Sequence, residues 1–176
     1  IDSKDRVALG SAAPDFFGGF YTQFKYKGFA LGAEFSYSKG NMAYNAVRNQ
    51  LEGMNTLGNQ SIAVLNRWSL DGQVTDMPRV QHNDPYRSTS FSERWLEDAS
   101  YLRMKSVTLS YSFDKTVLHF FRSGTLYVSG ENLLTGTKYL GLDPEFSYSY
   151  SETSQGLDYA KMVQPKSVKF GVNLKF

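Results

Sequence analysis

The chain has 176 residues, with 19 lysines and arginines against 17 aspartates and glutamates, and it contains no cysteine. The net charge of +2 gives no argument for a nucleic-acid-binding protein, and the lack of cysteine excludes disulfide frameworks, thiolate metal sites and cysteine nucleophiles. Twelve tyrosines, thirteen phenylalanines and a mean hydropathy of −0.41 are typical of a wall that is apolar on one side and polar on the other.

Alternation of apolar and polar residues begins near residue 17 and predicts two strands, 17–26 and 29–44. The intervening Lys27-Gly28 is a two-residue turn signal, so these strands are expected to form a hairpin. In the second strand Phe29 and Phe35 fall on the apolar face.

The alternation stops between residues 45 and 95, where we expect a long loop with short helices at 42–51 and 62–68. Irregular stretches of this length are uncommon in compact soluble domains but ordinary on the outer face of membrane barrels. Three residues in this loop are candidates for docking a protein partner, because Trp and Arg anchor many interfaces. They are Trp68, Arg87 and Trp95. Trp is equally ordinary at a membrane rim.

The strand pattern returns at 96–113. We expect Tyr101, Arg103 and Lys105 to share the face of Val107 and of the apolar residues that follow it. The charged part of this strand is then expected to stand above the membrane, and the apolar part to cross it.

A strand at 124–135 follows a short connection, and a second long loop spans 136–162. Aromatic and acidic residues of this loop are candidates for binding a substrate, because aromatic rings offer stacking surfaces and carboxylates accept hydrogen bonds. They are Tyr139, Asp143, Glu145, Tyr148, Tyr150 and Asp158. The alternative is that these side chains pack the loop against its neighbours.

The last strand, 164–176, has the clearest pattern, because Val168, Phe170, Val172, Leu174 and Phe176 alternate with polar or small residues. A strand that ends on an aromatic residue in such an alternation is usual in outer-membrane β-barrels, where one face meets lipid. The fold class we predict is all-β: an antiparallel meander forming the C-terminal arc of a large transmembrane β-barrel, with long extracellular loops. Five strands cannot close, since about eight make the smallest useful barrel.

The chain starts at Ile1 without a signal peptide, so we expect a C-terminal piece of a longer exported precursor, with any plug domain outside it. Catalysis is not expected, because His82 and His119 lie far apart and lack carboxylates at ligand spacing. Glu97 and Asp98 are adjacent strand residues that point to opposite faces, and we expect them to pair with Arg94 or Arg103. No metal site or cofactor is predicted.

Two segments match a known family more specifically than alternation does. The run at 91–111 reads FSERWLEDASYLRMKSVTLSY and resembles a run of SusC-type (SusC/RagA-like) TonB-dependent outer-membrane transporters. The strand at 126–135, LYVSGENLLT, with Asp143-Pro144-Glu145 after it, resembles the family's next strand and loop. The resemblance covers nearly the whole chain, and only Ala99 and Ser106 stand where Gly and Asn are commoner.

The resemblance implies an active importer of oligosaccharides or oligopeptides in the cell outer membrane, with a barrel of about 22 strands around an N-terminal plug. It implies a SusD-type lipoprotein as partner, energy from the TonB complex through the missing N-terminal region, and recognition of Phe176 by the barrel-assembly machinery. The alternatives are a siderophore- or cobalamin-type receptor, a passive porin, and a non-transporting glycan-binding β-domain. The substrate itself stays open.

Overall fold

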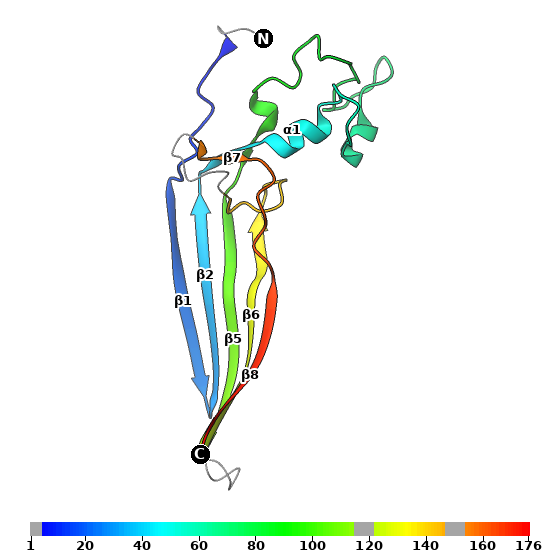
Figure 1. The fold of residues 1–176 in the computed structure, drawn as a ribbon. Coiled ribbons are helices and arrows are strands. Elements are labelled where there is room, and N and C mark those ends of the chain that lie inside the picture. Colours follow the sequence, from blue (N-terminus) through cyan, green and yellow to red (C-terminus); the bar gives the residue numbers. More distant parts are fainter. Residues whose placement is uncertain (1–4, 115–121, 147–153) are drawn as a thin grey trace. The chain divides into compact units, whose positions relative to one another are not determined.

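The computed structural model describes residues 5–114, 122–146 and 154–176 of the chain (Figure 1). These residues form two compact units, and each unit combines segments that are distant in the sequence. The sheet unit contains residues 14–39, 100–138 and 163–176, and the loop unit contains residues 1–13, 40–99 and 139–162. Among the described helices, none is long and apolar enough to cross a membrane.

The sheet unit is built on one five-stranded antiparallel sheet with the order β1-β2-β5-β6-β8 (Figure 1). Its strands are β1 (Phe16–Tyr26), β2 (Phe29–Lys39), β5 (Tyr101–Asp114), β6 (Ser123–Thr137) and β8 (Ser167–Lys175). Lys27 and Gly28 form the turn between β1 and β2 with φ values of +44° and +86°, and this pair of positive angles matches the twist of a two-residue hairpin. The expectation of an antiparallel, mainly-β fold is confirmed.

The register of the strands gathers apolar side chains into one continuous face. Phe24 pairs with Leu31, Leu31 with Leu109, Leu109 with Val128, and Val128 with Phe170. The neighbouring rows are also apolar or small. Side chains of this face are open to solvent, and Phe170 is 81% exposed.

Aromatic rings mark both ends of the apolar face. Phe16 contacts Tyr37 edge to face, with ring centroids 6.2 Å apart, and Phe20 stacks on Phe35 at 4.8 Å. At the turn end, the centroids of Phe29 and Tyr111 lie 4.6 Å apart, and those of Tyr111 and Phe113 lie 6.5 Å apart. Ten residue steps from Phe16 to Tyr26, at about 3.3 Å each and with a tilt of about 40°, span a height of about 25 Å. The two aromatic belts are therefore separated by about the apolar thickness of a barrel wall.

The opposite face of the sheet is polar and rich in hydroxyl groups. Thr108 and Ser129 share a hydrogen bond of 2.9 Å, and Ser112 and Thr125 share one of 3.1 Å. Farther along, Glu131 accepts hydrogen bonds from Ser167 and from the Lys169 ammonium group. The polar side chains thus bind to one another across neighbouring strands.

A β-bulge corrects the expected faces of the 96–113 strand. Ser106 pairs with Glu34, whereas Met104 pairs with Phe35, so Lys105 is an additional residue in β5. The inserted residue reverses the alternation, and Arg103 therefore pairs with Ser36 on the polar face. Tyr101 and Arg103 do not share a face with Val107, as the unbroken period had predicted.

The loop unit contains a small three-stranded sheet with the order β4-β3-β7, made of β3 (Met42–Asn45), β4 (Leu96–Asp98) and β7 (Leu157–Asp158). The expected strand 29–44 is therefore divided at Gly40 and Asn41, and the expected strand 96–113 is divided at Ala99 and Ser100. Gly40 has a φ of +89°, which favours glycine and lets the chain leave one sheet and enter the other.

Three short helices complete the loop unit: α1 (Ala46–Glu52), and the 3-10 helices η2 (Ile62–Asn66) and η3 (Glu93–Trp95). One buried cluster combines Ala43, Ala99 and Tyr139, with Phe146 packed on it, and a second combines Met54, Val64 and Met77. The stretch expected at 45–95 as a loop thus contains one buried cluster, and the stretch expected at 136–162 packs Tyr139 and Phe146 against Ala43 and Ala99.

Candidate functional site

Helix α1 supplies the first side chains of the candidate site. Asn45 caps the helix, because its side-chain oxygen accepts a hydrogen bond of 2.9 Å from the Arg48 backbone N–H. The Arg48 Nε donates to Glu52 Oε2 at 2.9 Å, one helical turn away. Local sequence spacing therefore places Arg48 in the first turn of α1 and pairs its guanidinium with Glu52 at the end of the helix.

Glu97 of β4 connects this helix to two other segments. Its Oε1 accepts a hydrogen bond of 2.8 Å from Arg48 Nη1 and one of 3.3 Å from Asn45 Nδ2, and its Oε2 accepts one of 2.9 Å from the Leu140 N–H. Burial lowers the pKa of Arg48, but the hydrogen bonds and charges of Glu97 and Glu52 outweigh this effect and raise it. The cation that pairs with Glu97 is Arg48, and not the expected Arg94 or Arg103.

Trp95 lies between two guanidinium groups. The Arg48 and Arg94 guanidinium carbons lie 5.6 Å and 4.8 Å from its ring centroid, and the indole is 1% exposed. Burial and the charge of Arg48 lower the pKa of Arg94. An indole this deeply buried offers no surface to a partner, so the structure gives Trp95 a packing position and not the expected docking position.

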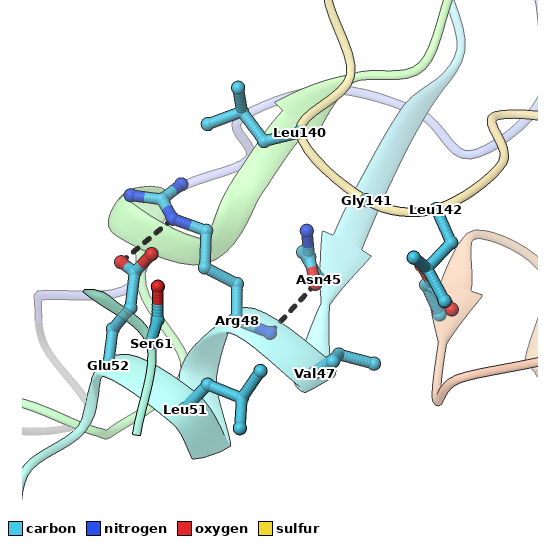
Figure 2. Close-up of a pocket in the computed structure, with 10 residues that line it drawn as sticks. Asn45, Val47, Arg48, Leu51, Glu52, Ser61, Leu140, Gly141 and Leu142 are labelled. Atoms are coloured by element: carbon cyan, nitrogen blue, oxygen red, sulfur yellow. Dashed lines mark hydrogen bonds and ion pairs between the residues drawn. The ribbon is translucent and has the colours of Figure 1, made fainter. Parts of the chain in front are cut away.

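A pocket of about 320 Å³ opens beside α1, between the helix and the segment at 140–142 (Figure 2). Its polar side is formed by Asn45, Arg48, Glu52, Ser61 and Asp158. Its apolar side is formed by Val47, Leu51, Leu140 and Leu142, of which the last two are 70% and 72% exposed. The volume lies at the lower end of the range for small-ligand sites.

Tyr139 and Asp158, both expected to contact substrate, instead bind each other. The Tyr139 hydroxyl donates a hydrogen bond of 2.6 Å to Asp158 Oδ2, and Asp158 Oδ1 accepts one of 3.1 Å from the Ala160 N–H. Both side chains are buried, and burial together with the bond to Asp158 raises the pKa of Tyr139. The phenol therefore stays protonated and ties the 139–146 segment to β7, although Asp158 still borders the pocket.

The other expected site residues are spread over the loop unit. Asp143 is buried and accepts a hydrogen bond of 2.9 Å from the Glu145 N–H, while Glu145 is half-buried. Tyr148 and Tyr150 lie outside the described residues. Trp68 is half-buried near the second cluster, where its backbone N–H donates to the Met77 carbonyl at 3.0 Å. Arg87 is exposed, with a φ of +56°.

The segment around Arg87 is held by Asp84. Its carboxylate accepts hydrogen bonds from the backbone and hydroxyl groups of Ser88 and Thr89, at 2.5 to 2.8 Å. Burial alone would raise the pKa of Asp84, but these hydrogen bonds lower it to about 2. Asn49 Nδ2 of α1 donates to the Thr89 carbonyl at 2.8 Å, and Asn55 Nδ2 donates to the Thr89 hydroxyl at 3.4 Å. The two ends of the 56–88 segment therefore lie close together.

Arg48, Leu140 and Leu142 were not among the expected site residues. The sequence carries a signal for Arg48, because Asn45 is a good N-cap residue and Arg48 and Glu52 have i,i+4 spacing. The position of Leu140 and Leu142 depends on the bond from the Leu140 N–H to Glu97, 43 residues away, which has no local sequence signal. Within the described residues, no group of three His, Cys, Asp or Glu side chains is arranged to hold a metal ion.

No protein-family model matches the chain. Individual proteins do match it. The chain is 33% identical, over its whole length, to TonB-dependent receptor P3 of Formosa agariphila, and 25% identical to TonB-dependent receptor SusC of Bacteroides thetaiotaomicron. It spans 18% of the length of the first of these relatives and 16% of the second.

The structure is similar to that of the RagAB peptide importer. The closed-closed state matches with a TM-score of 0.79 and 29% identity, covering 96% of this chain and 18% of that chain. The open-open state matches with a TM-score of 0.76 and the same identity, covering 95% and 18%. Together with the sequence matches, this confirms the resemblance seen in the run at 91–111. The chain spans about 18% of the length of such a homologue. Over its own full length it is homologous to SusC/RagA-type TonB-dependent receptors, a family of non-enzymatic outer-membrane β-barrel transporters.

Proposed function

We propose that this chain is the C-terminal arc of the barrel in a TonB-dependent importer that moves oligosaccharides or oligopeptides across the outer membrane. The observation that carries the proposal is the five-stranded sheet, which has a continuous, solvent-exposed apolar face and a hydroxyl-rich face. A single sheet with these faces suits lipid on one side and a wet lumen on the other. Homology to TonB-dependent receptors supplies the class of transporter.

The edges of the sheet support its membership of a larger wall. Within the described residues, β1 pairs only with β2, and β8 pairs only with β6. Lipid does not satisfy open strand edges, and five strands are too few to close on themselves. In the proposed barrel, strands from the rest of the transporter pair with both edges.

The loop unit is, in this proposal, the extracellular part that meets substrate and a SusD-type lipoprotein. The name of the RagAB peptide importer ends in the letters A and B, and this supports a second component in related transporters. Exposed aliphatic side chains such as Leu57, Ile62 and Val74 are available for a protein interface in the 55–89 region. In this proposal, TonB acts on a part of the transporter outside the 18% that this chain spans.

An excision tests this arrangement. Because Asn55 and Thr89 contact each other, residues 56–88 can be replaced by a short Gly-Ser linker without separating the ends. The full-length variant should still insert in the outer membrane, as measured by heat-modifiable gel mobility. It should lose lipoprotein co-purification and TonB-dependent uptake of the labelled oligomer that supports growth of the unmodified strain.

A second excision supplies the control. Shortening a periplasmic turn of the same barrel should leave co-purification unchanged. Undiminished lipoprotein binding and uptake in the 56–88 variant would show that this region only packs, and the partner proposal would be wrong.

A further inference from the structure

The pocket beside α1 combines two unlike sides, and each restricts the ligands that fit it (Figure 2). Its apolar side consists of Val47, Leu51, Leu140 and Leu142, and none of the ten lining residues is aromatic. Sugar rings are usually held by stacking on aromatic faces, and the described residues that line this pocket provide none. Aliphatic walls favour an aliphatic group, because burying it removes apolar surface from water.

The polar side restricts the charge of the ligand. Arg48 uses Nε for Glu52 and Nη1 for Glu97 and for the Arg94 carbonyl, so Nη2 is the guanidinium nitrogen that these bonds do not use. Glu52 and Glu97 balance the charges of Arg48 and of the neighbouring Arg94, and Asp158 adds a further negative charge at the pocket. A neutral carbonyl oxygen can accept from Nη2, whereas a ligand carboxylate would meet net negative charge.

The size of the pocket sets the third restriction. A volume of about 320 Å³ is small for an oligomer but adequate for one side chain and the backbone next to it. Leu140 and Leu142 are mostly exposed, so their surfaces are available to a ligand.

We propose that this pocket is a subsite for one aliphatic side chain of an extended peptide, with a main-chain carbonyl of the peptide on Arg48 Nη2. The inference rests on the importer function proposed above, because it assigns a peptide substrate to the transporter. The pocket should select an internal residue of the peptide, because the negative charges of Glu52, Glu97 and Asp158 disfavour a terminal carboxylate.

The test uses the full-length transporter in detergent and capped pentapeptides of the form Gly-Gly-Xaa-Gly-Gly, blocked at both ends. A peptide with photo-leucine at Xaa should crosslink to the pocket, with labelled positions at Leu51, Leu140 or Leu142. An unlabelled leucine peptide should compete at a concentration at least about tenfold lower than the alanine peptide, since the two differ by three carbon atoms.

Matched variants identify the site. Leu142→Gln and Leu140→Gln should each reduce crosslinking about fivefold or more, because each removes part of the aliphatic wall. Leu70→Gln is the control, since Leu70 is 71% exposed in the same unit but does not line the pocket. All three side chains are mostly exposed, so the fold should tolerate each change.

The inference would be overturned if the leucine and alanine peptides competed equally, or if a neutral oligosaccharide competed as well as the leucine peptide. Unchanged crosslinking in Leu142→Gln would also overturn it. Loss of lipoprotein co-purification in Leu142→Gln without any peptide crosslinking would also overturn it, and would assign the pocket to the protein partner. Crosslinking needs no energy source, so it is independent of uptake. Intact crosslinking with no TonB-dependent uptake would count against the importer function, while normal uptake without crosslinking would count against the subsite.

Discussion

Arginine substitutions along β8 should have effects that depend on depth in the membrane. The two aromatic belts end near Phe16 and Tyr26, so the middle row of the apolar face is the one that contains Thr22 and Val168. Each further row is two residues away, which is about 6.6 Å along the strand and about 5 Å in depth at a tilt of about 40°. Phe170 is then one row from the middle, and Leu174 is three rows from it.

The cost of a charge on the lipid face is about 2–4 kcal/mol at the midplane and about 0–1 kcal/mol near the interfaces. We therefore expect Val168→Arg to lower the free energy of unfolding by about 3–4 kcal/mol, Phe170→Arg by about 2–3 kcal/mol, and Leu174→Arg by about 1 kcal/mol or less. Leu174 is about 15 Å from the middle row, which places it just outside a band about 25 Å high.

The measurement is a reversible urea titration of the full-length transporter in lipid vesicles, followed by tryptophan fluorescence. Asn173→Arg is the matched control, because Asn173 pairs with Thr125 on the polar face of the same strand, and we expect a change of about 0.5 kcal/mol or less. If water covered the apolar face, Phe170→Arg would also cost about 0.5 kcal/mol or less, since Phe170 is 81% exposed. A flat series, or a larger loss for Asn173→Arg, would refute the assignment of the faces.

Three further predictions concern the loop unit and the end of the chain. Tyr139→Phe should weaken the link to β7 by about 1.5–3 kcal/mol, because it leaves the buried Asp158 carboxylate without its hydroxyl donor; unchanged hydrogen exchange in β7 would contradict this. The lowered pKa of Asp84 stabilises its loop above about pH 4, and this contribution should be lost as the pH falls towards 2. The protection of the Thr89 amide, measured relative to its intrinsic exchange rate at each pH, should fall in that window, and Asp84→Asn should remove this pH dependence. Deleting Phe176 should reduce the amount of transporter inserted in the membrane more than its stability once inserted, so unchanged surface levels on quantitative blots would argue against recognition by the assembly machinery.

The faces of the sheet could be predicted from the sequence because membrane and lumen impose a period of two on every strand. The division of the 29–44 strand was missed, although Gly40 carried a signal for it. Both halves alternate in the same way, so a period alone does not show that β2 and β3 belong to different sheets. The positive φ of Gly40 and the hydrogen bond from the Ala99 N–H to the Asn41 carbonyl, at 2.9 Å, mark the place where the two strands divide.

The candidate site was harder to predict than the sheet. Tyr139 and Asp158 were selected for their chemistry, and the structure uses that chemistry internally. A tyrosine and a carboxylate 19 residues apart in a loop can equally bind a ligand or each other, and composition does not distinguish these outcomes. Arg48 organises the pocket through Glu97, which is 49 residues away. Such long-range pairs depend on the packing of the loop unit, which the local pattern does not encode.

The bulge at Lys105 shows how one inserted residue moves a charged side chain from the apolar face of a sheet to its polar face. Without it, the alternation that puts Val107 on the apolar face would also put Lys105 and Arg103 there, with Lys105 opposite Phe35. With it, Met104 takes the position opposite Phe35, and Arg103 lies opposite Ser36, buried and 5.8 Å from the Tyr101 ring. A buried guanidinium facing lipid would cost several kcal/mol, whereas a bulge costs one unpaired position in the ladder. The bulge therefore lets one continuous strand keep Leu109, Val107 and Met104 on the apolar face and carry Arg103 on the polar face.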